Sequence, residues 1–98
     1  MNLDVDINIQ AIKPIFRQND ISFAGIFGSR AKGTQRESSD LDILVEFKKS
    51  KSLLDLIRVQ NIISDILNLD VDLVTEDSVS PLIKDKILRD LIVIYGKR

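Results

Sequence analysis

Two aspartates one residue apart, Asp40 and Asp42, stand at the start of an apolar run and could do chemistry together. In a strand, residues i and i+2 point to the same face, so both carboxylates would leave the sheet on one side. Carboxylates this close repel each other, and a shared divalent cation would keep both ionised. Two cations about 4 Å apart could clamp the attacking and leaving oxygens of a phosphoryl displacement. Alone, however, an Asp-x-Asp pair at a strand entrance is usually a structural feature.

A glycine and a serine, Gly28 and Ser29, end the preceding apolar run and make the aspartate pair a stronger signal. Glycine lets the backbone approach an anion closely or adopt a positive φ. The amides that follow, together with the Ser29 hydroxyl, can cradle a phosphate. Arg30 and Lys32 add positive charge nearby, although each could equally be a solvated surface residue. The spacing therefore predicts a site for a divalent metal and a phosphate.

A further pair of carboxylates, Asp70 and Asp72, lies in a later apolar run. Alternation along a strand would turn Val71 and Leu73 towards the core and the aspartates away from it. Asp72 is the better site candidate because it lies deeper in the run, and Asp70 is expected at the strand entrance. A third carboxylate could ligate a metal and help to deprotonate an attacking hydroxyl, since the chain has no histidine.

The elements that must position these residues follow from hydrophobic spacing and capping signals. We expect three helices and four strands, with the helices over about 7–18, 53–67 and 80–89 and the strands over about 21–27, 41–47, 70–74 and 91–95. Ser52 with Asp55 is typical of a capping box, and Ser80-Pro81 is typical of a helix start. The last run could instead prolong the final helix, and the apolar residues of the final helix and strand could be buried or form an interface. The order predicts a single α+β (α/β-like) domain over 1–98, with a small mixed sheet and helices mainly on one face.

Composition limits the chemistry. The 98 residues are 44% hydrophobic and 30% charged, as in an ordinary globular domain, and contain neither cysteine nor histidine. Thiolate sites and a histidine base are therefore excluded, and the carboxylates favour magnesium or manganese. The net charge of −1 gives no basic field for nucleic acid. No run approaches the roughly 20 apolar residues of a membrane span, and the N-terminus is acidic, so we expect a cytoplasmic protein.

The motifs together resemble the nucleotidyltransferase superfamily related to DNA polymerase β. The resemblance lies in Gly28-Ser29, ten further residues, Asp40-Leu41-Asp42, and the later Val71-Asp72-Leu73-Val74. With Gly-Ser-Arg-Ala-Lys-Gly followed by Ser-Asp-Leu-Asp, nearly the whole chain resembles a minimal nucleotidyltransferase (MNT) domain. Lys32 stands where an arginine is frequent, which is a mild departure.

The resemblance assigns roles to these positions. It implies that Asp40 and Asp42 are metal ligands, that Asp72 is the third catalytic carboxylate and metal ligand, and that Gly28 and Ser29 hold the donor's phosphates. It further implies ATP or another nucleotide as the donor and two Mg²⁺ ions, with Mn²⁺ as an alternative.

The resemblance also implies a partner. Minimal proteins of this family often pair with a HEPN-domain protein, and the MNT member is similar to antitoxins that attach AMP to a tyrosine of a HEPN ribonuclease toxin. We therefore expect AMP transfer from ATP to a hydroxyl of a partner protein, because the small chain leaves no lobe to bind another acceptor. The alternative is a non-catalytic antitoxin or nucleotide-binding subunit that neutralises its partner by binding. The acceptor residue, the base preference and any homo-oligomer stay open.

Overall fold

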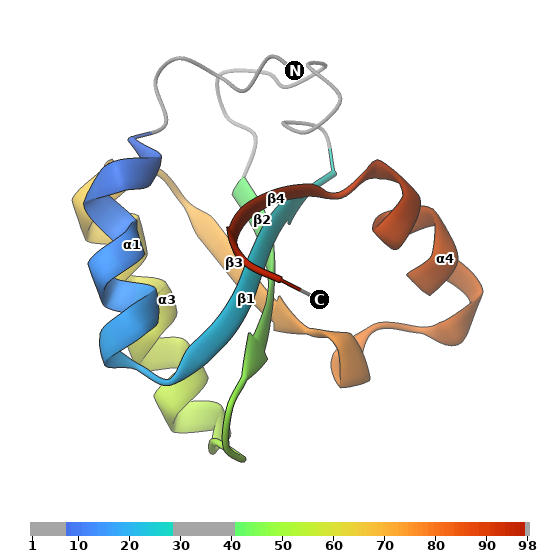
Figure 1. Ribbon diagram of the computed structural model, residues 1–98, viewed down its shortest axis with the longest axis horizontal. Coiled ribbons are helices and arrows are strands. Elements are labelled where there is room, and N and C mark those ends of the chain that lie inside the picture. The colour runs from blue at the N-terminus through green and yellow to red at the C-terminus, as the bar shows by residue number, and fades with distance from the viewer. Residues whose placement is uncertain (1–7, 29–40, 98) are drawn as a thin grey trace.

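The computed structural model describes residues 8–28 and 41–97, which form a four-stranded sheet flanked by helices (Figure 1). In chain order the elements are α1 (Ile9–Gln18), β1 (Ile21–Phe27), β2 (Leu41–Phe47), α3 (Leu53–Leu67), β3 (Val71–Thr75), the short 3₁₀ helix η1 (Glu76–Ser78), α4 (Pro81–Asp90) and β4 (Ile92–Gly96). Every expected element is present within two residues of its expected bounds. The last apolar run is a strand and does not prolong the final helix.

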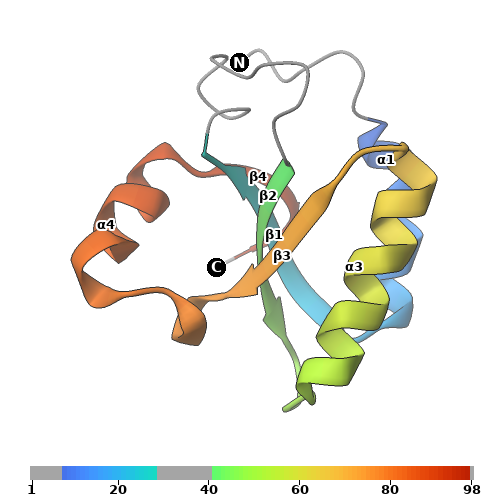
Figure 2. The same cartoon turned by 180° about the vertical axis from the view of Figure 1, so that it is seen from behind.

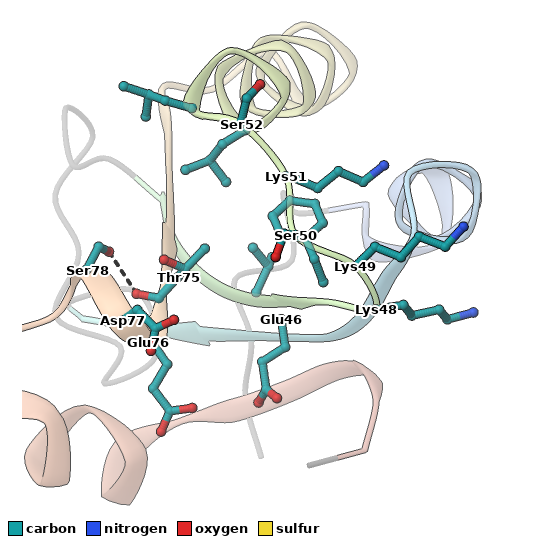
Figure 3. Close-up of a pocket in the computed structure, with 14 residues that line it drawn as sticks. Glu46, Lys48, Lys49, Ser50, Lys51, Ser52, Thr75, Glu76, Asp77 and Ser78 are labelled. Atoms are coloured by element: carbon teal, nitrogen blue, oxygen red, sulfur yellow. Dashed lines mark hydrogen bonds between the residues drawn. The ribbon is translucent and has the colours of Figure 1, made fainter.

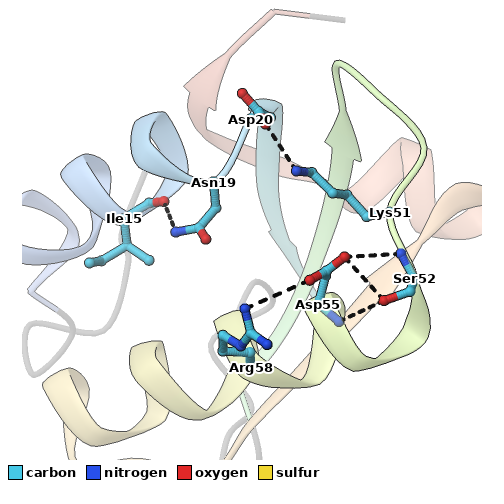
Figure 4. Close-up of polar contacts among 7 residues, drawn as sticks. All are labelled: Ile15, Asn19, Asp20, Lys51, Ser52, Asp55 and Arg58. Atoms are coloured by element: carbon cyan, nitrogen blue, oxygen red, sulfur yellow. Dashed lines mark hydrogen bonds and ion pairs between the residues drawn. The ribbon is translucent and has the colours of Figure 1, made fainter.

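The helix starts follow from their capping residues. The Ser52 hydroxyl accepts the Asp55 N–H at 3.2 Å, and the Asp55 carboxylate accepts the Ser52 N–H at 3.3 Å, so the predicted capping box is confirmed (Figure 4). Ser80 caps α4, with Pro81 in its first turn. Asn8 caps α1 by accepting the Ala11 N–H at 3.3 Å. The helices therefore begin where short polar side chains satisfy their first free amides.

The sheet has the strand order β3-β2-β1-β4. β1 pairs antiparallel with both β2 and β4, whereas β2 pairs parallel with β3. The sheet is thus mixed, as predicted. A parallel pair requires a crossover connection, and α3 is that connection between β2 and β3.

The helices divide between the two faces of the sheet (Figures 1 and 2). α1 and α3 lie side by side on one face and α4 lies on the other, so most of the helical cover is on one face, as expected. The main core is formed by side chains of α1, α3 and the strands that are less than one-tenth exposed, including Ile12, Phe16, Ile26, Ile43 and Ile63. Strand alternation places the equally buried Leu44 on the α4 face.

The start of α3 and the whole of α4 expose apolar side chains that a helix normally buries against the core. α3 buries Val59, Ile63 and Leu67, but the apolar Leu53 and Leu54 of its first turn are 69% and 73% exposed. α4, all of whose residues the structure describes, contains no buried residue. Burial therefore does not account for the apolar residues of its outer side. No helix within the described part of the chain is long and apolar enough to cross a membrane.

Candidate active site at the entrance of strand β2

The candidate site begins where β1 ends and β2 starts. Phe27, the last residue of β1, pairs directly with Asp42, and Gly28 follows with φ +79°. A Cβ atom on Gly28 would lie only 2.4 Å from Oδ2 of Asp42. Position 28 therefore requires glycine twice over, because the backbone is left-handed and because the Asp42 carboxylate occupies the space of a side chain.

A second carboxylate lies directly beside Asp42. The parallel ladder between β2 and β3 pairs Asp42 with Asp72, and neighbouring strands lie about 4.8 Å apart. Residues paired in register point to the same face, so both carboxylates leave the sheet on the side of α4. On the other side Leu41 and Leu73 are buried in the main core, which confirms the predicted orientation of Leu73.

The surroundings of the two carboxylates differ. Asp42 is half-buried, whereas Asp72 is exposed at the edge strand β3. Asp70 lies just before β3, where its carbonyl accepts the Leu41 N–H at 2.8 Å, which confirms its expected place at the strand entrance. The inner carboxylate is thus partly shielded from solvent, and the outer one is exposed to it.

A glutamine of α3 supports the outer strand. The side-chain Oε1 of Gln60 accepts the backbone N–H of Leu73 at 2.9 Å, one residue beyond Asp72. Edge strands present backbone groups that no neighbouring strand pairs, and Gln60 satisfies one of them. Hydrophobic periodicity alone predicts that Gln60 faces solvent. Only the tertiary packing of α3 on β3 reveals its role.

The remaining predicted site residues, Ser29, Arg30, Lys32 and Asp40, lie outside the described residues. Within residues 8–28 and 41–97, no three or more carboxylate, histidine or cysteine side chains are grouped as a metal site. What the described part provides is the pair Asp42 and Asp72, and Asp40 directly precedes β2 in the sequence. An all-carboxylate donor set beside a side-chain-free glycine fits a hard divalent cation that binds through oxygen.

Comparison with known proteins identifies the family. The sequence model described as polymerase beta, nucleotidyltransferase, matches residues 10–98. The chain belongs to this nucleotidyltransferase family. A candidate protein adenylyltransferase of Methanocaldococcus jannaschii is 44% identical over 90 residues, which cover 88% of this chain and 97% of the relative. The protein adenylyltransferase MntA of Thermococcus cleftensis is 39% identical over 70 residues, or 71% of each chain.

Solved structures agree with the fold of this nucleotidyltransferase. A crystal structure of a toxin–antitoxin with AMP-PNP matches it with a TM-score of 0.81 at 26% identity, covering 94% of this chain and 76% of the other. The predicted class, a small α+β nucleotidyltransferase fold with a mixed sheet, is therefore confirmed. Within that fold, Asp42 of β2 lies between Gly28, which follows β1, and Asp72 of β3.

Proposed function

We propose that this nucleotidyltransferase moves AMP from ATP onto a hydroxyl group of a partner protein. The observation that carries the proposal is the in-register pair Asp42 and Asp72 on one face of the sheet, with Asp42 against Gly28. Two adjacent carboxylates are costly unless a cation compensates them, and a glycine beside them leaves room for a phosphate. The relatives named as protein adenylyltransferases support a protein as the acceptor.

The carboxylates would hold Mg²⁺, or Mn²⁺ in its place. Asp42 and Asp72 would share the ligation with Asp40, which directly precedes β2. When bound, the two ions supply positive charge that stabilises the charge developing on the phosphate oxygens. Gly28 and Ser29 would hold the donor's phosphates, with Arg30 and Lys32 adding positive charge nearby.

The transfer is written as an in-line displacement. The acceptor oxygen forms a bond to the α-phosphorus, and the bond from that phosphorus to the α,β-bridging oxygen breaks. Pyrophosphate leaves, and Asp72 takes the hydroxyl proton at the exposed edge of the sheet. The exposure of Asp72 matters here because the acceptor has to arrive from outside the chain.

The partner that fits best is a HEPN-domain toxin in the cytoplasm, with this chain as its single-domain MNT antitoxin. The MNT-like motifs and the similarity to a toxin–antitoxin structure support that assignment. In such a pair, modification of a toxin hydroxyl would neutralise the toxin covalently.

One experiment tests the proposal. The protein is incubated with Mg²⁺, the purified product of the adjacent gene and ATP labelled in the α-phosphate or, separately, in the γ-phosphate. We expect label on the partner from α-labelled ATP only, and none with EDTA. Label from γ-labelled ATP would indicate phosphoryl transfer. No label at all, with toxin neutralisation unchanged in Asp42→Asn, would indicate an antitoxin that acts by binding.

A further inference from the structure

A second surface lies at the other end of β2 from Asp42. A hollow of about 680 Å³ is bounded by the turn that follows β2, the first turn of α3 and the segment that follows β3 (Figure 3). Its apolar lining includes Val45, Phe47 and Leu56. Val45 and Thr75, which line the hollow, lie three residues beyond Asp42 and Asp72 in extended strands, or about 10 Å. The hollow is therefore separate from the carboxylate pair.

Three lysines and three carboxylates line this hollow, and all three lysines come from residues 48–51. Residues 48–58 contain three lysines and one arginine against a single aspartate, a net charge of +3 in a chain whose total is −1. Lys51 is paired with Asp20 at 2.9 Å, and the aspartate, Asp55, is engaged by Ser52 and by Arg58 at 3.9 Å (Figure 4). Lys48 and Lys49 are exposed, and neither has an ion-pair partner among residues 8–28 and 41–97.

The same segment exposes apolar side chains. Leu53 and Leu54 are more than two-thirds exposed and Ile57 is 40% exposed. Leu53 lines the hollow, and Ile57 lies one turn further along the same side of α3. Neighbouring apolar residues left in water and rimmed by charge mark interaction sites on proteins. Residues 48–58, with the hollow, are named here the α3 docking surface.

We propose that the α3 docking surface binds a partner protein through an acidic amphipathic segment. Leucine-sized side chains of that segment would enter the hollow and its carboxylates would meet Lys48 and Lys49. The proposal rests on the proposed function in one respect, namely that the partner is the protein that accepts AMP. Docking at a distance from Asp42 and Asp72 leaves the carboxylates open to an acceptor hydroxyl while the partner is held.

The charges select a protein over other macromolecules. Glu46, Glu76 and Asp77 also line the hollow, so a phosphate backbone with uniform negative charge would be repelled there. An amphipathic segment can direct its carboxylates to Lys48 and Lys49 and its apolar side chains to the rest of the lining. A concave surface with walls of both signs also suits a folded segment better than a flat lipid headgroup layer. The outer side of α4 is the rival apolar surface, but Lys84 there is already paired with Glu76 at 3.1 Å. The basic and apolar features coincide at α3.

The test measures binding of the purified product of the adjacent gene, by calorimetry at low and high salt. We expect Lys48→Glu with Lys49→Glu to weaken binding by roughly tenfold or more at low salt. Leu54→Asp should weaken it by about 30-fold or more at either salt concentration, since it places a charge where the proposed complex would bury an apolar side chain. Matched controls on α4, Lys86→Glu with Arg89→Glu, and separately Leu82→Asp, should stay within about threefold of wild type. Circular dichroism confirms that each variant is folded.

Several results would overturn the proposal. Equal affinities of the α3 and α4 variants for the partner, or no complex at all, would contradict it. So would self-association of this chain that Leu54→Asp abolishes, or binding to anionic phospholipid vesicles in place of the protein. AMP transfer measured on the same samples separates the two proposals. Lysine-dependent binding without transfer would contradict the proposed function alone. AMP transfer, together with binding that is unchanged by substitutions at Lys48, Lys49 and Leu54, would contradict the docking surface alone.

Discussion

The two ends of strand β2 are built by different means. At its start, backbone geometry sets the site, because a left-handed Gly28 admits the Asp42 carboxylate and strand register aligns Asp72 with it. Past its end, side chains set the surface, through the Ser52 and Asp55 capping box and the Lys51–Asp20 ion pair. The first end pairs two carboxylates, and the turn past the second end, residues 48–51, carries three lysines. A short domain can thus place its nucleotidyl-transfer site and the proposed partner-binding surface at different ends of one strand.

The difference predicts how each end tolerates change. A site set by backbone geometry should lose its activity when a single methyl group is added. A surface set by side chains should lose binding gradually as its residues are replaced one by one.

The largest effect is expected for Gly28→Ala. The new Cβ would lie 2.4 Å from Asp42 Oδ2 and the backbone would stay left-handed, so the carboxylate must move. We expect AMP transfer to fall by roughly 100-fold, as for a misplacement of about 1 Å. The matched control is Gly25→Ala, whose Cβ would meet Leu91 at 2.7 Å and not a carboxylate. It should lower the free energy of unfolding but largely spare transfer, and equal losses of transfer in both variants would contradict the contrast.

A smaller effect is expected for Gln60→Leu, which keeps the side-chain size but leaves the Leu73 N–H without its acceptor. The free energy of unfolding should fall by about 1–3 kcal/mol, measured by urea titration. Gln60→Glu keeps an acceptor oxygen and should recover most of the loss. The exposed neighbour Asn61 serves as control, and Asn61→Leu should change little. If Gln60→Leu and Asn61→Leu are equally stable, Gln60 does not support the strand that carries Asp72.

The smallest effect concerns pH at the basic end. The hydrogen bond and charge of Lys51, followed by Lys49 and Lys48, hold the pKa of Asp20 below its ordinary value of 3.8. A carboxylate with a lowered pKa stabilises the fold above the unfolded-state pKa, and that contribution disappears as pH falls through the lowered value. Wild type should therefore lose its advantage over Asp20→Asn on going from about pH 5 to about pH 3.

Thermal unfolding at each pH measures the difference between wild type and Asp20→Asn. Asparagine tolerates the φ of +60° at this position, so backbone strain is not the variable. Asp55 also has a lowered pKa, mainly through its hydrogen bonds from Ser52, but it is present in both proteins and cancels. A pH-independent difference would show that the Lys51 pair contributes no stability. Because Asp20 is at the surface, a difference of a few degrees at most is expected.

Local signals predicted the elements well. Gly28 marked the end of β1, and Ser52 with Asp55 marked the start of α3, because turns and caps are encoded within a few residues. Strand alternation likewise predicted which side chains of the later apolar run face the core, and Val71 and Leu73 are buried there. These features need no knowledge of the partner strand.

What could not be predicted depends on contacts between distant segments. The register that places Asp42 beside Asp72 joins residues thirty positions apart. The acceptor role of Gln60 and the hollow beside Leu53 exist only once α3 lies across β3. Leu54 is apolar at helical spacing, yet it is exposed, because α3 buries only some of its apolar side chains against the sheet. The assignments of Ser29, Arg30, Lys32 and Asp40 remain predictions from the sequence.

The most direct measurement is the rate of AMP transfer at saturating Mg²⁺ and ATP for Asp42→Asn and Asp72→Asn, beside Asp85→Asn on the exposed side of α4. Asparagine keeps the size of the side chain and removes the charge that a divalent cation needs. We expect a loss of roughly 100-fold or more in both site variants, and a rate within about threefold of wild type for Asp85→Asn. Transfer by Asp42→Asn at the wild-type rate would contradict a carboxylate-based nucleotidyl-transfer site at the entrance of β2.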